Sequence, residues 1–281
     1  MWKKVLIGAL ATMMMGATAM ASDHIQMGGS SDVYPLALKL TDQFRTEKGV
    51  QFRVTYKNSD YGINGVADGT LDIGNASRDL NSTDPAGLVS TAICQDAVVM
   101  IVNPRIKVKN LTTAQIQAIY SGKDVYWSDV QAGLPHTKIV VETREAGSGT
   151  LDCFTKQIMG STPIKSSIVT VNDGSPALKT AVANTPNAIG FISLGYVDNT
   201  SVMGCSLNGV TASVATVHNK TYPGRNFNMI TKGAPAGNVR DFLNWVLGPH
   251  GQALVSADGE IPNATSVSAA NHTQRTQRAH R

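Results

Sequence analysis

The stretch Lys138–Phe154, "KIVVETREAGSGTLDCF", decides the fold because it joins a strand to a helix through a glycine-rich turn. Its first residues are rich in β-branched side chains, which predicts a strand that ends at Arg144. Phe154 and Ile158 then begin a helical spacing. Strand–turn–helix units build α/β proteins, and ligands bind at the turns.

The same alternation of strand and helix patterns runs along most of the chain. Helices are predicted at 33–44, 112–121, 151–158 and 239–246, and strands at 50–56, 97–102 and 188–194. Thr112 is a suitable N-cap for the second helix, and Gly122 is a suitable stop. The chain is therefore predicted to be an α/β protein with mostly parallel strands.

Composition describes a globular body that carries almost no net charge. The 281 residues are 42% hydrophobic and 16% charged, with a formal charge of +4. Lys3, Lys4, Arg275, Arg278 and Arg281 lie in acid-free ends, and without these five cations the body has a formal charge of −1. This near-neutral body lacks the basic footprint of a nucleic-acid-binding protein.

The N-terminus has the pattern of a bacterial secretory signal peptide. Two lysines precede an apolar run to about Met15, and Ala19-Met20-Ala21 forms a small-x-small cleavage site. We predict that residues 1–21 are removed and that the exported, periplasmic protein begins near Ser22. The alternative, a membrane anchor, needs a longer apolar run than this one.

The cysteines leave the pairing open. Cys94, Cys153 and Cys205 allow three pairings, each with one thiol left over, and sequence does not choose among them. We favour Cys153–Cys205, since an exported protein permits a disulfide. No cysteine or histidine spacing indicates a metal site.

Four predicted strand-to-helix junctions carry hydroxyl groups and glycines. Backbone amides at helix starts, serine and threonine hydroxyls, and an arginine fork together suit a tetrahedral oxyanion. The alternative at each junction alone is ordinary helix capping, and either arginine could form a surface ion pair. The four are Gly29-Ser30-Ser31-Asp32, Asn58-Ser59-Asp60-Tyr61-Gly62, Asn75-Ala76-Ser77-Arg78, and Arg144 with Gly147-Ser148-Gly149-Thr150.

Two enzyme templates fail on spacing. A P-loop requires Gly-Lys-Ser/Thr five residues after a first glycine, whereas Gly122-Lys123 is followed by Asp124. A nucleophile elbow requires Gly-x-Ser-x-Gly, and Gly147-Ser148-Gly149 has the wrong spacing. These failures argue against a hydrolase.

Several stretches resemble the phosphate-binding proteins of bacterial ABC phosphate importers. They include "GGSSDVYPLALKLTDQF", "GVADGTLDIGNASRDL", "VVETREAGSGTLDCF" and "NAIGFISLGYV", in the family's order across about residues 24–202. The resemblance implies a type II periplasmic binding protein fold, with two lobes of mixed, mostly parallel sheet flanked by helices and joined by two hinge strands. We expect the chain to cross between the two lobes near Val102 and again near Met203. Lobe I would then consist of residues 22–102 and 203–262, and lobe II of residues 103–202. Residues 263–281 are predicted to be a disordered polar and basic tail.

The resemblance also implies a function and a set of site residues. The chain would capture inorganic phosphate without catalysis, cofactor or metal, and would deliver it as a monomer to a membrane permease. The implied phosphate-binding residues are Ser30, Ser31, Ser59, Ser77 and Arg78, with Arg144, Ser148, Gly149 and Thr150 from the opposite lobe.

One departure from the family pattern suggests how phosphate is selected. Asp60 stands in a loop, "NSDYGING", where the family usually carries small residues. A carboxylate from Asp60 or Asp96 could accept a hydrogen bond from protonated phosphate and repel sulfate; the alternative is that Asp60 faces solvent. Rival functions are binding of arsenate, sulfate or another tetrahedral oxyanion, and a secreted phosphatase or esterase.

Overall fold

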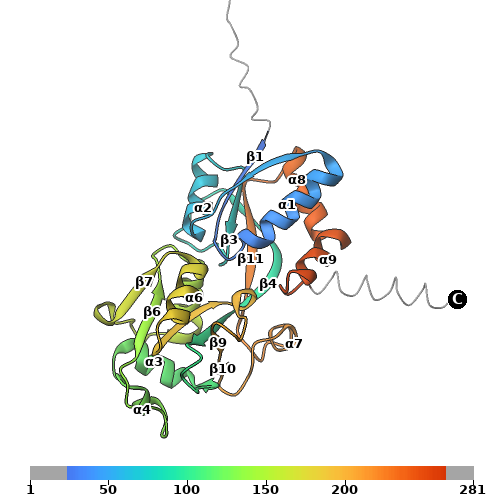
Figure 1. The fold of residues 1–281 in the computed structure, drawn as a ribbon. Helices are drawn as coiled ribbons and strands as arrows, with labels where there is room; N and C mark the ends of the chain where they lie inside the picture. Colours follow the sequence, from blue (N-terminus) through green and yellow to red (C-terminus); the bar gives the residue numbers. More distant parts are fainter. Residues whose placement is uncertain (1–23, 264–281) are drawn as a thin grey trace, which may run out of the picture.

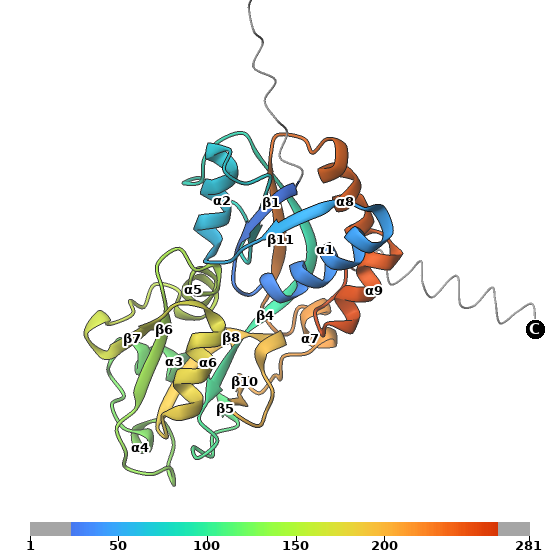
Figure 2. The same ribbon diagram turned by 45° about the horizontal axis from the view of Figure 1, so that its top comes forward.

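The computed structural model describes residues 24–263, which form two lobes joined by extended strands (Figures 1 and 2). One nine-stranded sheet runs through both lobes in the order β2-β1-β3-β11-β4-β8-β6-β7, with β9 also paired to β4. Its strands are β1 (His24–Gly29), β2 (Gln51–Val54), β3 (Ile73–Ala76), β4 (Leu88–Val102), β6 (Val140–Arg144), β7 (Val169–Asn172), β8 (Ala188–Ser193), β9 (Met203–Gly204) and β11 (Gly224–Lys232). The predicted α/β, two-lobed fold is confirmed.

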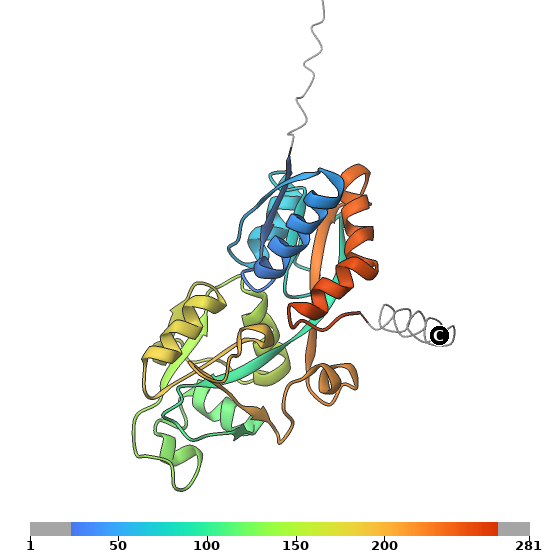
Figure 3. The same ribbon diagram turned by 45° about the vertical axis from the view of Figure 1, so that its right-hand side comes forward.

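In the first lobe, parallel strands β2, β1 and β3 continue into antiparallel β11. Three helices cover one face of this sheet, and α2 covers the other (Figure 3). Phe44 packs edge-on against Phe242, with ring centroids 5.2 Å apart, and ties two of the three helices together. The helices are α1 (Tyr34–Lys48), α2 (Ser59–Asp68), α8 (Gly237–Leu247) and α9 (Pro249–Ala257).

In the second lobe, β6 lies between β7 and β8, parallel to both, and β8 is antiparallel to β4. Phe154 and Phe191 stack with centroids 3.9 Å apart in the core beneath the sheet. The helices are α3 (Thr113–Ser121), α4 (Trp127–Val130), α5 (Gly149–Phe154), α6 (Gly174–Asn184) and α7 (Val214–His218), with short turns η1 (Thr155–Met159), η2 (Ser166–Ile168) and η3 (Leu194–Tyr196). β5 (Asn110–Leu111) and β10 (Ser206–Leu207) form a separate two-stranded sheet.

Strand β4 is the continuous connection between the lobes. It pairs with β11 up to Ala97 and with β8 from Val98 onward, so its partner changes between these two residues. Cys205 and Tyr222 pack in the second lobe's core, before β11 enters the first lobe. We therefore propose crossings near Ala97 and near Gly224, which moves residues 98–102 and 203–223 from the predicted lobe I into lobe II.

Local signals in the sequence were reliable where they were strong. Thr112 forms a capping box with Gln115, and Gly122 ends α3 in the left-handed conformation, as predicted. The prediction of a loop at "NSDYGING" is wrong, because helix α2 begins at Ser59, directly after its N-cap Asn58. Its glycines permit close packing: a Cβ at Gly62 would lie 2.7 Å from the Asn75 carbonyl oxygen.

The favoured Cys153–Cys205 disulfide is also wrong. All three cysteines are free and buried. The Cys153 thiol faces the Ser77 carbonyl oxygen at 3.7 Å, while the Cys205 thiol faces that of Val108 at 3.6 Å. Each thiol packs as a small apolar group in its own surroundings.

The remaining predictions about the chain ends lie outside the described residues. These are the signal peptide and all but the first residue of the tail. Within residues 24–263, no helix has the length and apolar character needed to cross a bilayer.

Candidate functional site

Strand β1 delivers three polar residues to the space between the lobes. It ends at Gly29, whose φ of +144° brings the backbone against β3, where a Cβ would lie 2.0 Å from the Asn75 carbonyl oxygen. The chain then turns into α1 through Ser30, Ser31 and Asp32, all at most 3% exposed. A side chain in place of Gly29 would displace this turn.

Strand β6 delivers the facing residues from the second lobe. Gly147 has φ +81°, and Ser148 caps α5 by accepting a hydrogen bond from the Leu151 N–H at 3.3 Å. Gly149 then lies so close to the first lobe that a Cβ would be 2.5 Å from Ser59 Oγ and 2.7 Å from Ser77 Oγ. The two loops therefore meet directly, with no space for a larger residue at 149.

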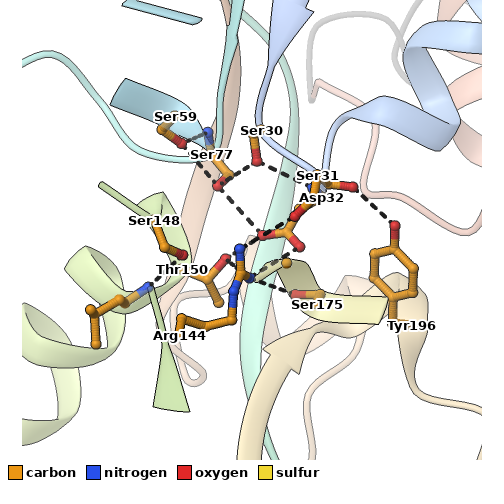
Figure 4. A network of polar contacts seen from close by, with 12 residues as sticks. Ser30, Ser31, Asp32, Ser59, Ser77, Arg144, Ser148, Thr150, Ser175 and Tyr196 are labelled. Atoms are coloured by element: carbon orange, nitrogen blue, oxygen red, sulfur yellow. Dashed lines mark hydrogen bonds and ion pairs between the residues drawn. The ribbon is translucent and has the colours of Figure 1, made fainter. Parts of the chain in front are cut away.

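Arg144 lies at the centre of the facing groups (Figure 4). Its Nη1 donates to Ser175 Oγ at 2.8 Å and to Thr150 Oγ1 at 3.2 Å, and its Nη2 donates across to Ser31 Oγ at 3.3 Å. Glu145 accepts from Nε and Nη2 on the other side of the guanidinium. Arg144 is 2% exposed, so the hydroxyls and the charge are largely shielded from water.

Asp32 is the acceptor toward which these donors converge. Its Oδ2 accepts from Thr150 Oγ1 and from Arg225 Nη2 at 3.1 Å, and its Oδ1 lies 3.6 Å from Arg144 Nη1. Burial acts to raise the pKa of Asp32, but Arg144 and Arg225, with help from hydroxyl donors, hold that pKa below its ordinary value. Asp32 is therefore an ionised carboxylate inside the protein.

Arg225, on β11 next to the lobe crossing, completes this network. Its Nε donates to Asp96 Oδ2 at 2.8 Å, and its Nη1 donates to Thr150 Oγ1 at 2.9 Å and to the Ser77 carbonyl oxygen at 3.2 Å. The guanidinium also lies over the Phe227 ring, 5.3 Å from its centroid. One buried arginine thus contacts β4, α5 and the first lobe's loops together.

Hydroxyl groups of the first lobe form a chain leading to the same carboxylate. Ser30 Oγ donates to Ser77 Oγ at 2.9 Å, and the Ser77 N–H donates to Ser59 Oγ at 3.1 Å. Tyr196, from the second lobe, donates its hydroxyl proton to the Ser31 carbonyl oxygen at 3.0 Å. Hydroxyls from both lobes therefore surround one point between them.

Comparison with known proteins identifies the family of this chain. A family model described as "PBP superfamily domain" matches residues 16–250. The chain belongs to the PBP superfamily. It is 28% identical over 249 residues to the phosphate-binding protein PstS of Bacillus subtilis, which covers 86% of this chain and 81% of the relative.

Two solved structures resemble this PBP-superfamily chain over most of their length. One is the crystal structure, with bound phosphate, of a Clostridium perfringens protein assigned as a phosphate ABC transporter substrate-binding protein; identity is 33% and the TM-score is 0.79, over 85% of this chain and 99% of that one. The other is an ABC-type phosphate transport receptor from Vibrio cholerae, with 26% identity and a TM-score of 0.71, over 85% of this chain and all of the other.

Arg78 does not join the network around Asp32. Its Nη1 and Nη2 each lie 2.7 Å from one Asp84 carboxylate oxygen, and Nη2 also donates to Asp60 Oδ1 at 2.8 Å. These bonds raise the pKa of Arg78 further above its ordinary value, chiefly through Asp84. The guanidinium that we predicted from the sequence to bind phosphate is therefore paired with two carboxylates.

The two predicted acceptor carboxylates, Asp60 and Asp96, are likewise paired with arginines. Asp60 has a half-exposed side chain beside Arg78. Asp96 is fully buried, with Oδ1 accepting from the Leu194 N–H at 3.0 Å and Oδ2 facing Arg225 Nη2 at 2.6 Å. The carboxylate that meets the predicted donors Thr150 and Arg144 is instead Asp32.

The structure thus brings together Ser30, Ser31, Ser77, Arg144 and Thr150, with Ser59, Ser148 and Gly149 in the adjoining layer. Sequence reasoning missed Asp32, Ser175 and Arg225. Asp32 precedes α1, at "GGSSD", and Ser175 lies in the first turn of α6, at "DGSP"; a polar residue at a helix start is a weak signal. Arg225 lies two residues before buried Phe227 and four before buried Met229 on the same strand. Because side chains two residues apart share a face of a strand, this spacing could have predicted that Arg225 faces inward.

A pocket of about 480 Å³ opens beside the network, lined by both lobes and by the crossing strands. Arg225 and Cys153 form part of its wall, with the amide side chains of Asn81, Gln95 and Gln157. Among residues 24–263, no group of three histidine, cysteine or acidic side chains is arranged to hold a metal ion.

Proposed function

We propose that this chain captures inorganic phosphate between its two lobes and delivers it to the membrane permease of an ABC importer. The observation that carries the proposal is the convergence of hydroxyl and guanidinium donors from both lobes on one buried point (Figure 4). Relatives with the same architecture are named phosphate-binding proteins, and one such structure contains phosphate.

The proposed site consists of Ser30, Ser31 and Ser77 from the first lobe with Arg144 and Thr150 from the second. These groups supply short donors and one fixed positive charge in a dry environment, where charge-assisted hydrogen bonds are strongest. Ser59, Ser148 and Gly149 support them, since Ser59 holds Ser77 and Gly149 permits contact between the loops. We place Arg78 outside this site.

We expect the protein to bind phosphate in preference to sulfate. Asp60 and Asp96 remain the residues predicted from the sequence to accept a hydrogen bond from protonated phosphate. Asn substitution of each tests them separately, because amide and carboxylate have similar shape and differ in charge. An unchanged phosphate-to-sulfate affinity ratio in both variants would exclude both residues from selection. Arsenate shares the geometry and protonation of phosphate and serves as the third ion.

The deciding experiment is calorimetric titration of the protein, lacking residues 1–21, with phosphate, sulfate and arsenate. Saturable binding of one phosphate per chain supports the proposal, and absence of heat with all three ions contradicts it. The rival phosphatase or esterase is tested by turnover of p-nitrophenyl phosphate with and without added divalent metal. Export and a monomeric state are parts of the proposal that cell fractionation and light scattering check.

A further inference from the structure

The donors assigned to phosphate already hold a carboxylate of the chain itself. Thr150 Oγ1 donates to Asp32 Oδ2, and the Ser77 hydroxyl faces the same oxygen at 3.5 Å. Arg144 Nη1 and Arg225 Nη2 approach the carboxylate at 3.6 Å and 3.1 Å. The Asp32 side chain is 0% exposed, so protein groups and not water surround its carboxylate.

These contacts cross between the lobes. Asp32 belongs to the turn before α1 in the first lobe, whereas Arg144 and Thr150 belong to β6 and α5 in the second. An ionised carboxylate attracts both guanidinium groups in a region of low dielectric constant. Asp32 therefore holds the two loops against each other in the way that a bound anion would.

Phosphate and Asp32 cannot use the same donors at the same time. The Thr150 hydroxyl has a single proton, which it gives to Asp32, and it already accepts from Arg144 and Arg225. Placing a dianion next to ionised Asp32 would also oppose like charges within a few ångströms. For phosphate to reach Arg144 and Thr150, the Asp32 carboxylate has to leave them.

We propose that Asp32 is an internal competitor, a carboxylate on which the two lobes close and which phosphate displaces from Arg144 and Thr150. The displacement part rests on the proposed function, whereas the closing part does not. Because a closed, self-occupied form lowers the fraction of protein able to bind, Asp32 weakens the apparent affinity for phosphate. Removing its charge should favour the open form and tighten phosphate binding.

The test compares wild type with Asp32→Asn, and Asp42→Asn is the matched control. Asp42 lies on α1, the helix that follows Asp32, with an exposed side chain paired to Arg45, so the control removes the same charge at the protein surface. Small-angle X-ray scattering in phosphate-free buffer measures the radius of gyration, and calorimetry measures phosphate affinity. A second variant, Asp32→Ser, checks that the result does not depend on the asparagine amide.

We expect both Asp32 variants to have a larger radius of gyration than wild type without phosphate, and to bind phosphate about 10-fold more tightly. Asp42→Asn should match wild type in both measurements. Weaker phosphate binding in both Asp32 variants, or an unchanged radius of gyration, overturns the proposal. If no variant binds phosphate, the proposed function fails, while the scattering result still decides whether Asp32 closes the lobes.

Discussion

Arg144 and Arg78 make an instructive comparison, because Arg144 ends a strand, Arg78 lies two residues after one, and each precedes a hydroxyl-rich or acidic turn. Arg144 faces Ser31, Thr150 and Ser175. Arg78 faces Asp84 and Asp60, with one bond to each oxygen of Asp84. Arg144 also pairs with Glu145 and lies 3.6 Å from Asp32, but its Nη1 and Nη2 both donate to neutral hydroxyls as well. The side-chain partners of Arg78, by contrast, are both carboxylates.

The difference shows that an arginine's function depends on whether its N–H groups face neutral hydroxyls as well as carboxylates. Arg225 is the intermediate case, since Asp32 and Asp96 both contact it and its side chain is 2% exposed. Because these groups are shielded from water, removing one of them leaves the charge of its partner buried and uncompensated.

The largest effect is expected from Arg225→Ala on stability. Removing the guanidinium leaves Asp32 and Asp96 buried without it, which costs about 3–5 kcal/mol in the free energy of unfolding. Urea denaturation measures this loss. Arg240→Ala is the control, because Arg240 pairs with Asp241 on the surface with more than half of each side chain exposed. A loss below that of a typical surface pair, about 1 kcal/mol, would contradict the buried network.

Arg144→Ala should weaken phosphate binding by about 30- to 150-fold, or about 2–3 kcal/mol, because one charge-assisted contact is lost. Calorimetry measures the affinity, and circular dichroism confirms that the fold is kept. Ser148→Ala is a suitable comparison, since Ser148 Oγ is used to cap α5. Equal effects of the two substitutions would mean that Arg144 is not a central donor.

The fold was predictable because it depends on local patterns that the sequence repeats. The capping box at Thr112, the strand ending at Arg144 and the alternation of strands and helices are each encoded within a few residues. The start of α2 was missed because Gly62 and Gly65 suggest a loop, whereas close packing of Gly62 against β3 and of Gly65 against Leu71 favours glycines within this helix. Contacts between distant segments outweighed local propensity there.

The site was only partly predictable, because pairing between distant charges has no local signal. Ser30, Ser77, Arg144 and Thr150 lie in or beside turns that a sequence can identify. Asp32 and Arg225 are 193 positions apart in the chain, and only the fold brings them within 3.1 Å. Arg78 and Asp84 are only six residues apart, but they lie between β3 and β4 in a segment without helix or strand, where no regular spacing predicts a pair.

Arg78→Ala should change phosphate affinity by less than about 3-fold while reducing stability by about 1–2 kcal/mol. The loss arises because Asp84 loses the hydrogen bonds that chiefly hold its pKa below the ordinary value. The smaller cost relative to Arg225 reflects the half-exposed Asp60 side chain. Calorimetric titration with phosphate checks the affinity, and urea denaturation checks the free energy of unfolding. A fall in phosphate affinity like that of Arg144→Ala would return Arg78 to the site.

The smallest effect concerns Glu260, the acid that lies beside Arg225 and Asp96 at the lobe interface. Its Oε1 approaches Gly195 of η3 so closely that a Cβ there would lie 2.6 Å away. Burial, followed by repulsion from Asp96, raises the pKa of Glu260 well above its ordinary value of 4.5, although Arg225 acts in the opposite direction. Folded Glu260 therefore keeps a proton that the unfolded chain loses.

Because the folded state binds this extra proton, stability should fall as pH rises from 4.5 toward the raised pKa, with a slope of at most about 1.4 kcal/mol per pH unit. Glu260→Gln lacks the titrating group, so its free energy of unfolding should decline less than that of wild type between pH 5 and 8. Urea denaturation at each pH measures the difference, with Asp42→Asn again as control. Parallel pH profiles for wild type and Glu260→Gln would show that Arg225 keeps Glu260 ionised. Arg225 would then compensate three carboxylates, more than the two that neutralise Arg78.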